Sequence, residues 1–144
     1  MYLMKNYIPE DLRRLVASRS GFRCEYCLIE ESDTFLGCEV DHIISLKHGG
    51  ITEADNLAYA CTFCNRKKGS DIGSILWETG AFIRFFNPRK DRWEDHFRWE
   101  GFRIIPQSEI GEVTEQIIGF NHLDRILERK FGTFQKAIKV ANSL

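Results

Sequence analysis

The chain has 144 residues, which is enough for one compact domain or for a small core with an extension packed against it. A hydrophobic fraction of 43% and an aromatic fraction of 12% exclude an intrinsically disordered chain. The net charge of −1 gives no argument for a polyanionic partner. No apolar run approaches the roughly 18 residues of a membrane span, so we expect no membrane partner.

The first part of the chain predicts a helix over residues 9–19. Pro9 suits the first turn, acidic residues follow it, and Gly21 ends the helix. The residues expected on one helix face are Leu12, Leu15, Val16 and Arg19. Residues 1–6 lack the apolar segment of a signal peptide, and we therefore expect a cytoplasmic protein.

The central part predicts two strands and a helix. Residues 38–46 are rich in β-branched and apolar side chains and predict a strand that ends before Lys47-His48-Gly49-Gly50. The sequence Thr52-x-x-Asp55 resembles a capping motif for one short turn. A second, brief strand is expected over residues 56–60, and a helix over residues 62–69. The predicted order is therefore strand, loop, strand, helix.

The C-terminal part is less regular. Residues 78–80 predict a turn before the apolar stretch 81–86, and residues 97–105 alternate about Glu100-Gly101 like a hairpin. From residue 121 onward, apolar residues recur at helical spacing, interrupted by Gly132. We expect this stripe to lie in the core rather than on a partner-facing surface. It consists of Leu123, Ile126, Leu127, Phe131, Phe134 and Ile138.

Four of the five cysteines form two pairs with the same spacing. In Cys24-x-x-Cys27 and Cys61-x-x-Cys64 a tight turn can place both sulfurs about 2.3 Å from one metal ion. Two such pairs predict one tetrahedral structural Zn²⁺ site. Redox chemistry and inert buried thiols are the alternatives. Cys38 is expected to be a small buried hydrophobic residue rather than a ligand.

Residues suited to phosphodiester hydrolysis lie between and beside these pairs. Asp41 supplies an anionic oxygen and Asn65 an amide oxygen, which suit Mg²⁺ or Mn²⁺ with water and phosphate completing the shell. His42, with an ordinary pKa of about 6.5, is substantially neutral at physiological pH and can accept a proton. Neighbours on a regular strand point to opposite sides, so Asp41 and His42 can serve one site only if the strand twists, bulges or ends there.

Together these positions resemble the HNH endonuclease motif in its four-cysteine version. The matching run is Asp41-His42-Ile43-Ile44, Gly49-Gly50, Asp55-Asn56-Leu57 and Cys61-x-x-Cys64-Asn65-x-x-Lys68-Gly69. The resemblance covers residues 22–70, and several independent positions agree at once. Because the third motif position of the family is His or Asn, Asn65 makes this sequence similar to an H-N-N variant.

The resemblance implies an α+β fold with a small zinc-stapled ββα-metal core. We expect this nuclease core, with an N-terminal helix, to occupy residues 1–75. Residues 76–144 would form a C-terminal hairpin-plus-helix extension that packs on the core and whose role is unknown.

The resemblance also implies a role for each matched residue. Asp41 and Asn65 would bind the catalytic ion, and His42 would be the general base for the attacking water. Asn56 would form hydrogen bonds across the loop and hold the strand of His42 in register. The four cysteines would bind structural zinc away from the chemistry. Similar enzymes leave a 5′-phosphate and a 3′-hydroxyl, and double-stranded DNA is the expected substrate.

Basic and aromatic residues follow the motif. Lys67 and Lys68 are candidates for contact with a neighbouring phosphate, although a basic cluster is usually only a solvated surface. Residues 86–99, with Asn87-Pro88-Arg89 and Trp93-x-x-His96-Phe97, resemble a tail that follows the HNH motif in many bacterial proteins. Trp93 and Trp99 could stack on bases, but packing over the core is the more frequent role. Asp95-His96 lacks flanking cysteines, and we assign it to structure.

Two other classes of function are compatible with the cysteines. A catalytically inactive zinc module that binds nucleic acid or protein needs the cysteines but not Asp41, His42 and Asn65. A redox or metal-sensing protein would expose a thiol pair without those residues. The joint presence of the three residues favours the nuclease.

Overall fold

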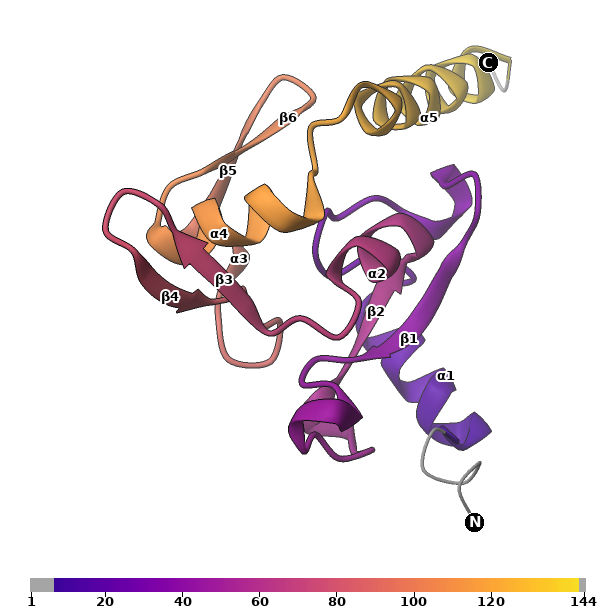
Figure 1. The fold of residues 1–144 in the computed structure, drawn as a ribbon. Helices are drawn as coiled ribbons and strands as arrows, with labels where there is room; N and C mark the ends of the chain where they lie inside the picture. Colours follow the sequence, from indigo (N-terminus) through magenta and orange to yellow (C-terminus); the bar gives the residue numbers. More distant parts are fainter. Residues whose placement is uncertain (1–6, 143–144) are drawn as a thin grey trace.

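The structure is a computed structural model that describes residues 7–142, with the side chains of all of these residues except 133–140. Within that range the strands form three two-stranded antiparallel sheets: β1 (Cys38–His42) with β2 (Leu57–Cys61), β3 (Gly73–Leu76) with β4 (Ala81–Arg84), and β5 (Phe97–Glu100) with β6 (Arg103–Pro106). The helices are α1 (Glu10–Arg19), α2 (Thr62–Lys68), α3 (Trp93–His96), α4 (Glu109–Ile118) and α5 (Leu123–Asn142). Short 3₁₀ turns are η2 (Glu31–Asp33), η3 (Leu46–His48) and η4 (Ala54–Asn56). The predicted α+β class is confirmed (Figure 1).

The strands β1 and β2 and the helix α2 form the motif that carries most of the predicted site residues. The strand register runs from Cys38 opposite Cys61 to His42 opposite Leu57. The chain passes directly from β2 into α2, because Cys61 ends the strand and is also the helix N-cap, where its sulfur accepts a hydrogen bond from the backbone of Cys64. The helix packs on both strands. The predicted order of strand, loop, strand and helix is confirmed.

The first strand is shorter than the sequence pattern predicts. It ends at His42, and η3 begins at Leu46. Beyond His42 the N–H and carbonyl of Ile44 are bound by the side chain of Asn56 instead of by a partner strand. The apolar run therefore continues past the point where backbone pairing stops.

The predicted N-terminal helix is confirmed as α1, which packs against β2. Val16 is buried, whereas Leu15, expected on the same helix face, is 46% exposed. Arg19, the last helical residue, donates hydrogen bonds to the carbonyls of Ala54 and Leu57 at 2.7 and 2.6 Å. These bonds attach the end of α1 to the start of β2.

The main hydrophobic core is built by both halves of the chain. The first half contributes the four paired cysteines, Tyr26, and Ala58 and Ala60 of β2, and the second half contributes Phe86, Trp93, Phe97, Ile104, Ile118 and Phe120. The Trp93 indole donates a hydrogen bond to the carbonyl of Tyr26 at 2.8 Å. Trp99 lies beside Trp93 with ring centroids 5.6 Å apart and remains 45% exposed. Core packing is therefore confirmed for Trp93 and holds only partly for Trp99.

The predicted hairpin over residues 97–105 is confirmed as β5 and β6, and the turn at residues 78–80 joins β3 to β4. The sequence pattern does not predict β3, α3 or α4. The structural assignment of Asp95-His96 agrees with its surroundings, because His96 Nδ1 lies 2.7 Å from the hydroxyl of Ser108 and its ring lies against Phe86.

Over residues 123–132 of α5, the buried side chains are charged rather than apolar. The side chains of Leu123, Leu127 and Phe131 are 71%, 51% and 53% exposed, so their predicted core position is wrong. Phe134 and Ile138 belong to the same stripe and lie outside the described side chains. The helix continues through Gly132, where an interruption was expected.

The residues of α5 that are buried instead are Arg125, Glu128 and Arg129. Among the described residues, no helix combines the length and the apolar character that crossing a membrane requires.

Candidate metal centre and hydrolytic site

The four paired cysteines lie together where residues 24–27 meet β2 and α2. Their sulfur atoms are all within 4.8 Å of one another, and the four residues are buried. The sulfurs of Cys27 and Cys61 are 3.8 Å apart, close to the edge of a tetrahedron with metal–sulfur bonds of about 2.3 Å. The donor set therefore fits a zinc ion and could hold one structurally. Cys38 is half-buried and lies outside the cluster.

A buried arginine contacts this cluster. One terminal nitrogen of Arg125, on α5, lies 3.1, 3.3 and 3.5 Å from the sulfurs of Cys27, Cys61 and Cys64. Burial lowers the pKa of the guanidinium, but the neighbouring sulfurs outweigh burial and raise it. For the Cys27 thiol the effects have the opposite sign. Burial raises its pKa, but hydrogen bonds with the other cysteines and the charge of Arg125 bring the pKa well below its ordinary value. The contact with Arg125 thus favours the thiolate form at Cys27. Burial instead raises the pKa of the Cys24 and Cys64 thiols well above the ordinary value.

At the opposite end of β1 a carboxylate is paired with a buried lysine. The Nζ atom of Lys68 lies 3.0 Å from Oδ2 of Asp41 and donates to the carbonyl of His42, also at 3.0 Å. The Lys68 side chain is 2% exposed and that of Asp41 is 15% exposed. Burial raises the pKa of the Asp41 carboxyl, and Lys68 counteracts part of that rise. Lys68 is thus enclosed, while Asp41 keeps access to solvent.

His42 is the last residue of β1, and its ring contacts the loop that follows. Its Nε2 atom lies 2.8 Å from the hydroxyl oxygen of Thr52. Burial lowers the pKa of the imidazole, outweighing the opposite effect of Asp41. The capping role predicted for Thr52 is wrong, because η4 has Glu53 at its N-cap position without a side-chain hydrogen bond. The Thr52 hydroxyl contacts His42 instead.

Asn56 closes the loop between β1 and β2. Its Oδ1 accepts a hydrogen bond from the N–H of Ile44, and its Nδ2 donates to the carbonyls of Ile44 and Ile51, all at 2.9 Å. A Cβ atom on Gly50 would lie 1.7 Å from the carbonyl oxygen of Ile44, so only glycine fits this close approach. These contacts fix the path of the chain after His42.

Asn65 lies on the side of α2 that faces β1. Asn65 and Lys68 are three residues apart and therefore leave the same face of the helix. Because Lys68 reaches Asp41, Asn65 lies one turn away from that contact, toward the cysteines. The Asn65 side chain is half-buried and forms no hydrogen bond with the residues that the structure describes. Its amide oxygen is thus available as a donor to a metal ion.

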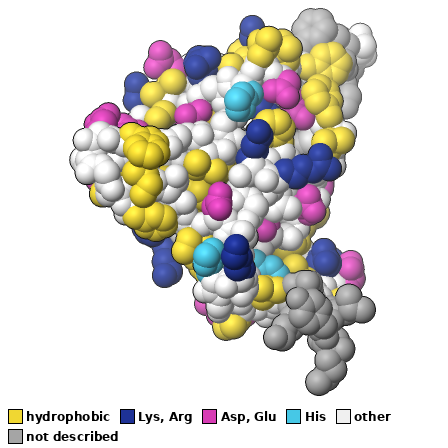
Figure 2. Space-filling model, in the orientation of Figure 1, with side chains coloured by type: hydrophobic (Ala, Val, Ile, Leu, Met, Phe, Trp, Pro, Cys, Tyr) yellow, Lys and Arg dark blue, Asp and Glu magenta, His cyan; other side chains and the backbone are white. Residues whose placement is uncertain are grey.

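Basic side chains lie on both sides of the end of β1. Arg66 and Lys67 on α2 are exposed, and so is Lys47 in η3. Figure 2 shows Lys and Arg side chains over α2 and again over the loop between β1 and β2, where histidines also reach the surface. Phosphate groups that approach this face would meet positive charge from two elements.

The segment that contains the cysteine cluster and the end of β1 also carries a family signature. Residues 24–71 match the HNH endonuclease family. We call residues 24–71 the HNH segment, and the family description suggests a nuclease. No curated protein and no solved structure matches the chain. The HNH segment ends before residues 86–99, so the resemblance of the tail stays a prediction.

Three contacts of the site escape sequence reasoning. Thr52 was assigned to a cap, and Arg125 lies far outside the HNH segment with no local pattern to mark it. Lys68 was expected near phosphate, but its enclosure by Asp41 and the His42 carbonyl does not favour that contact. The spacing Asn65-x-x-Lys68, about one helical turn, is the signal that could have placed Lys68 beside the predicted ligands of the catalytic ion.

Proposed function

We propose that the chain is a metal-dependent HNH endonuclease that hydrolyses phosphodiester bonds in nucleic acid, with double-stranded DNA as substrate. The observation that carries the proposal is the arrangement at the end of β1. There Lys68, on the face of α2 that bears Asn65, contacts the Asp41 carboxylate and the carbonyl of His42, and the His42 imidazole contacts Thr52. The HNH match over residues 24–71 supports the same assignment.

Asp41 and Asn65 are the proposed ligands of the catalytic ion, Mg²⁺ or Mn²⁺. Carboxylate and amide oxygens are the hard donors that such ions prefer. When bound, the ion would stabilise the charge that develops on the departing oxygen. Lys68 holds the Asp41 carboxylate from its buried side and is a positioning residue. Lys67, which is exposed, is the proposed phosphate contact in its place.

His42 is the proposed general base. Its Nε2 atom is engaged with the Thr52 hydroxyl, so we assign Nδ1 as the nitrogen that accepts a proton from the attacking water. This assignment requires that Nε2 carries the ring proton and donates it to Thr52. Thr52 then fixes the ring, and Asn56 fixes the loop that carries Thr52.

Cys24, Cys27, Cys61 and Cys64 are the proposed ligands of a structural Zn²⁺ ion. They are buried, and the elements β1, β2 and α2 lie between them and the proposed hydrolytic residues. The zinc would therefore fix the start of α2 and leave the reaction to the other end of the motif.

The test is cleavage of a supercoiled plasmid by the zinc-loaded protein with Mg²⁺, Mn²⁺ or EDTA. We expect nicking with a divalent ion and none with EDTA. His42→Ala should lower the rate by about a hundredfold or more, while zinc content and thermal unfolding stay unchanged. His48→Ala, an exposed histidine six residues further on, is the matched control and should cut like the parent.

Two outcomes would contradict the proposal. If His42→Ala cuts as fast as the parent, His42 is not the base. If the parent binds DNA or protein but cleaves nothing with either ion, the chain is the inactive zinc module. A zinc module needs the cysteines but gains nothing from Asp41, His42 and Asn65.

A further inference from the structure

The buried side of α5 bears charged residues, and one of them faces the cysteine cluster. Arg125, Glu128 and Arg129 follow one another at helical spacing and are 3%, 8% and 8% exposed. Arginine and glutamate are rarely buried to this extent unless their charges are paired. Among them, Arg125 donates hydrogen bonds to three sulfur atoms of the cluster, and Glu128 accepts one from the backbone N–H of Phe35.

Arg125 is enclosed, and sulfur atoms are its hydrogen-bond acceptors. One terminal nitrogen contacts Cys27, Cys61 and Cys64, whereas Nε and Nη1 are buried without a hydrogen-bond partner among the described residues. The guanidinium carbon lies 4.2 Å from the centre of the Phe63 ring. The Glu128 carboxylate is 3.8 Å from Nε, too long for a hydrogen bond. The sulfurs thus account for the direction in which the buried cation points.

We propose that Arg125 is part of the zinc site, so that zinc retention and the docking of α5 stabilise each other. A Zn²⁺ ion with four thiolates carries a net charge of −2, which is costly to bury without a compensating cation. The guanidinium supplies a positive charge and hydrogen bonds on the face formed by three of the four sulfurs. Residues that contact metal ligands in this way typically change metal affinity by 10- to 100-fold.

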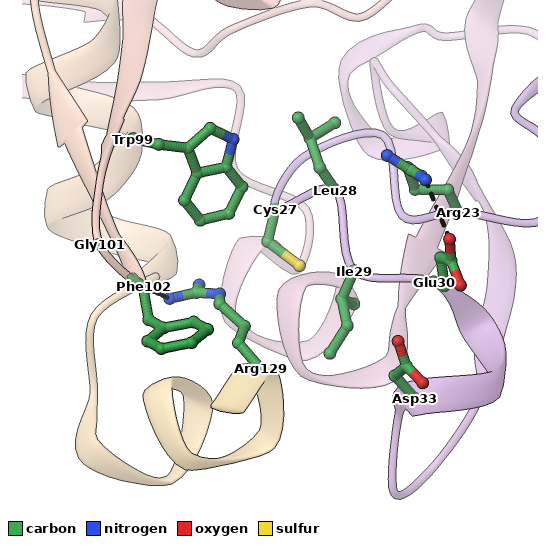
Figure 3. A pocket seen from close by; sticks show the side chains of 10 residues that line it. All are labelled: Arg23, Cys27, Leu28, Ile29, Glu30, Asp33, Trp99, Gly101, Phe102 and Arg129. Atoms are coloured by element: carbon green, nitrogen blue, oxygen red, sulfur yellow. Dashed lines mark hydrogen bonds and ion pairs between the residues drawn. The ribbon is translucent and has the colours of Figure 1, made fainter. Parts of the chain in front are cut away.

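A second buried arginine of α5 donates to backbone carbonyls. Arg129 donates hydrogen bonds to the carbonyls of Phe102 and Phe120 at 2.8 and 2.5 Å. Figure 3 shows its guanidinium between Trp99 and Phe102, in a pocket that Cys27 also lines. Arg125 and Arg129 therefore attach the same helix through different hydrogen-bond acceptors, sulfur atoms for Arg125 and backbone carbonyls for Arg129. The inference concerns the zinc site and does not rest on the nuclease chemistry.

The test uses the full chain and the variants Arg125→Met and Arg125→Lys. Methionine has a similar length and no charge, so it can fill the space without binding thiolates. Arg98→Met is the control, because Arg98 is exposed and pairs only with Glu100. The measurements are the rate at which zinc passes to a colorimetric chelator, and the sulfur-to-metal charge-transfer band after substitution with Co²⁺.

We expect Arg125→Met to release zinc about tenfold faster than the parent or more, with a shifted cobalt band. Arg125→Lys keeps a positive charge and N–H donors, so its rate of zinc release should lie between those of the parent and Arg125→Met. Arg98→Met should release zinc at the rate of the parent. If Arg125→Met retains zinc like the parent and leaves the cobalt band unchanged, the proposal is wrong. In that outcome methionine would have replaced the buried charge without loss of stability, as well-packed apolar side chains often do.

A second measurement does not depend on the folding of any variant. In the parent protein, an NMR-active cadmium isotope in place of zinc should show a scalar coupling to a guanidinium proton of Arg125. This coupling passes through the N–H···S hydrogen bond. Resolved Arg125 resonances without such a coupling would overturn the proposal.

Discussion

The two ends of the β1–β2–α2 motif each pair negative groups with one buried cation, but they are closed to different degrees. At the cysteine end Arg125 meets three sulfurs, and all four cysteines are buried. At the other end Lys68 meets a single carboxylate, and Asp41 keeps access to solvent. Cys64 and Lys68 lie one turn apart on α2, so one short helix serves both ends.

The difference separates a site that is complete from one that has room for a substrate. A structural metal site takes all its ligands from the protein, whereas a catalytic site keeps positions open. The four sulfurs fit the first description, and the proposed pair of Asp41 and Asn65 fits the second. The cations differ in the same way, since Arg125 shares its charge among several ligands and Lys68 orients one.

The largest expected effect is the loss of the cysteine end. Cys24→Ala removes one of four ligands, and because metal binding at such a site is coupled to folding, we expect the protein to lose zinc and its cooperative unfolding transition. Zinc stoichiometry and circular dichroism check this result. A folded, zinc-free Cys24→Ala protein would mean that the cluster is not a structural site.

The second effect concerns Lys68. In Lys68→Met the Asp41 carboxylate loses its buried partner, and we expect stability to fall by about 3 kcal/mol in urea unfolding. The double variant Asp41→Asn/Lys68→Met should recover part of this loss, because no unpaired charge remains. Lys67→Met, the exposed neighbour, is the control and should change stability by no more than about 0.5 kcal/mol. If Lys68→Met and Lys67→Met lower stability equally, the ion pair of Lys68 with Asp41 does not stabilise the fold.

A smaller effect is expected at Thr52. Thr52→Val removes the hydroxyl that contacts His42 but keeps the shape of the side chain, and we expect cleavage to slow by about tenfold. Thr52→Ser should restore the rate, because the hydroxyl returns. Single-turnover cleavage of a labelled duplex measures both variants. If serine fails to restore what valine removes, Thr52 acts through packing rather than through the hydrogen bond.

The smallest effect is expected at an ion pair that lies outside the β1–β2–α2 motif, and its loss of stability is the baseline for the other variants. Asp91 accepts two hydrogen bonds from Arg84, which hold the pKa of its carboxyl below the ordinary value. A carboxyl with a lowered folded pKa stabilises the fold above its unfolded pKa of about 3.9, and this contribution is lost only as the pH falls toward the lower, folded value.

Asp91→Asn should therefore cost about 1 kcal/mol or less, since Arg84 is half exposed. The cost should be the same at pH 6, 7 and 8 in urea unfolding. A cost that changes across this range would show that another group controls it.

Sequence patterns predicted the parts of the molecule whose signals are local. The cysteine pairs, the β-branched and apolar residues of β1 and the helix after Cys61 all depend on neighbours a few residues apart. β3 was missed because it has four residues and begins with Gly73, which leaves little alternation to detect. In α4, Gly111 and the β-branched Val113 and Thr114 lower helix propensity, although Ser108 caps the first turn through its side chain.

Other features could not be predicted because their partners are distant in sequence. The apolar stripe of α5 located the helix but selected the wrong face, since the apolar residues Leu123 and Leu127 face solvent while Arg125 meets sulfurs. The pairing of Lys68 with Asp41 and of Thr52 with His42 likewise depends on how β1, its loop and α2 come together. Motif spacing identified the candidate residues, and the tertiary fold determined their partners.

The shared hydrophobic core has a practical consequence for anyone who trims the chain. A fragment limited to residues 24–71 would keep every proposed ligand and yet lose Phe86, Trp93 and Phe97, whose rings cover Tyr26 and the cysteines. Such a fragment would expose the apolar surface beneath them and would be prone to aggregate. The boundaries of a recognisable motif therefore differ from the boundaries of a unit that can be expressed, and expression trials should keep the sequence at least through α5.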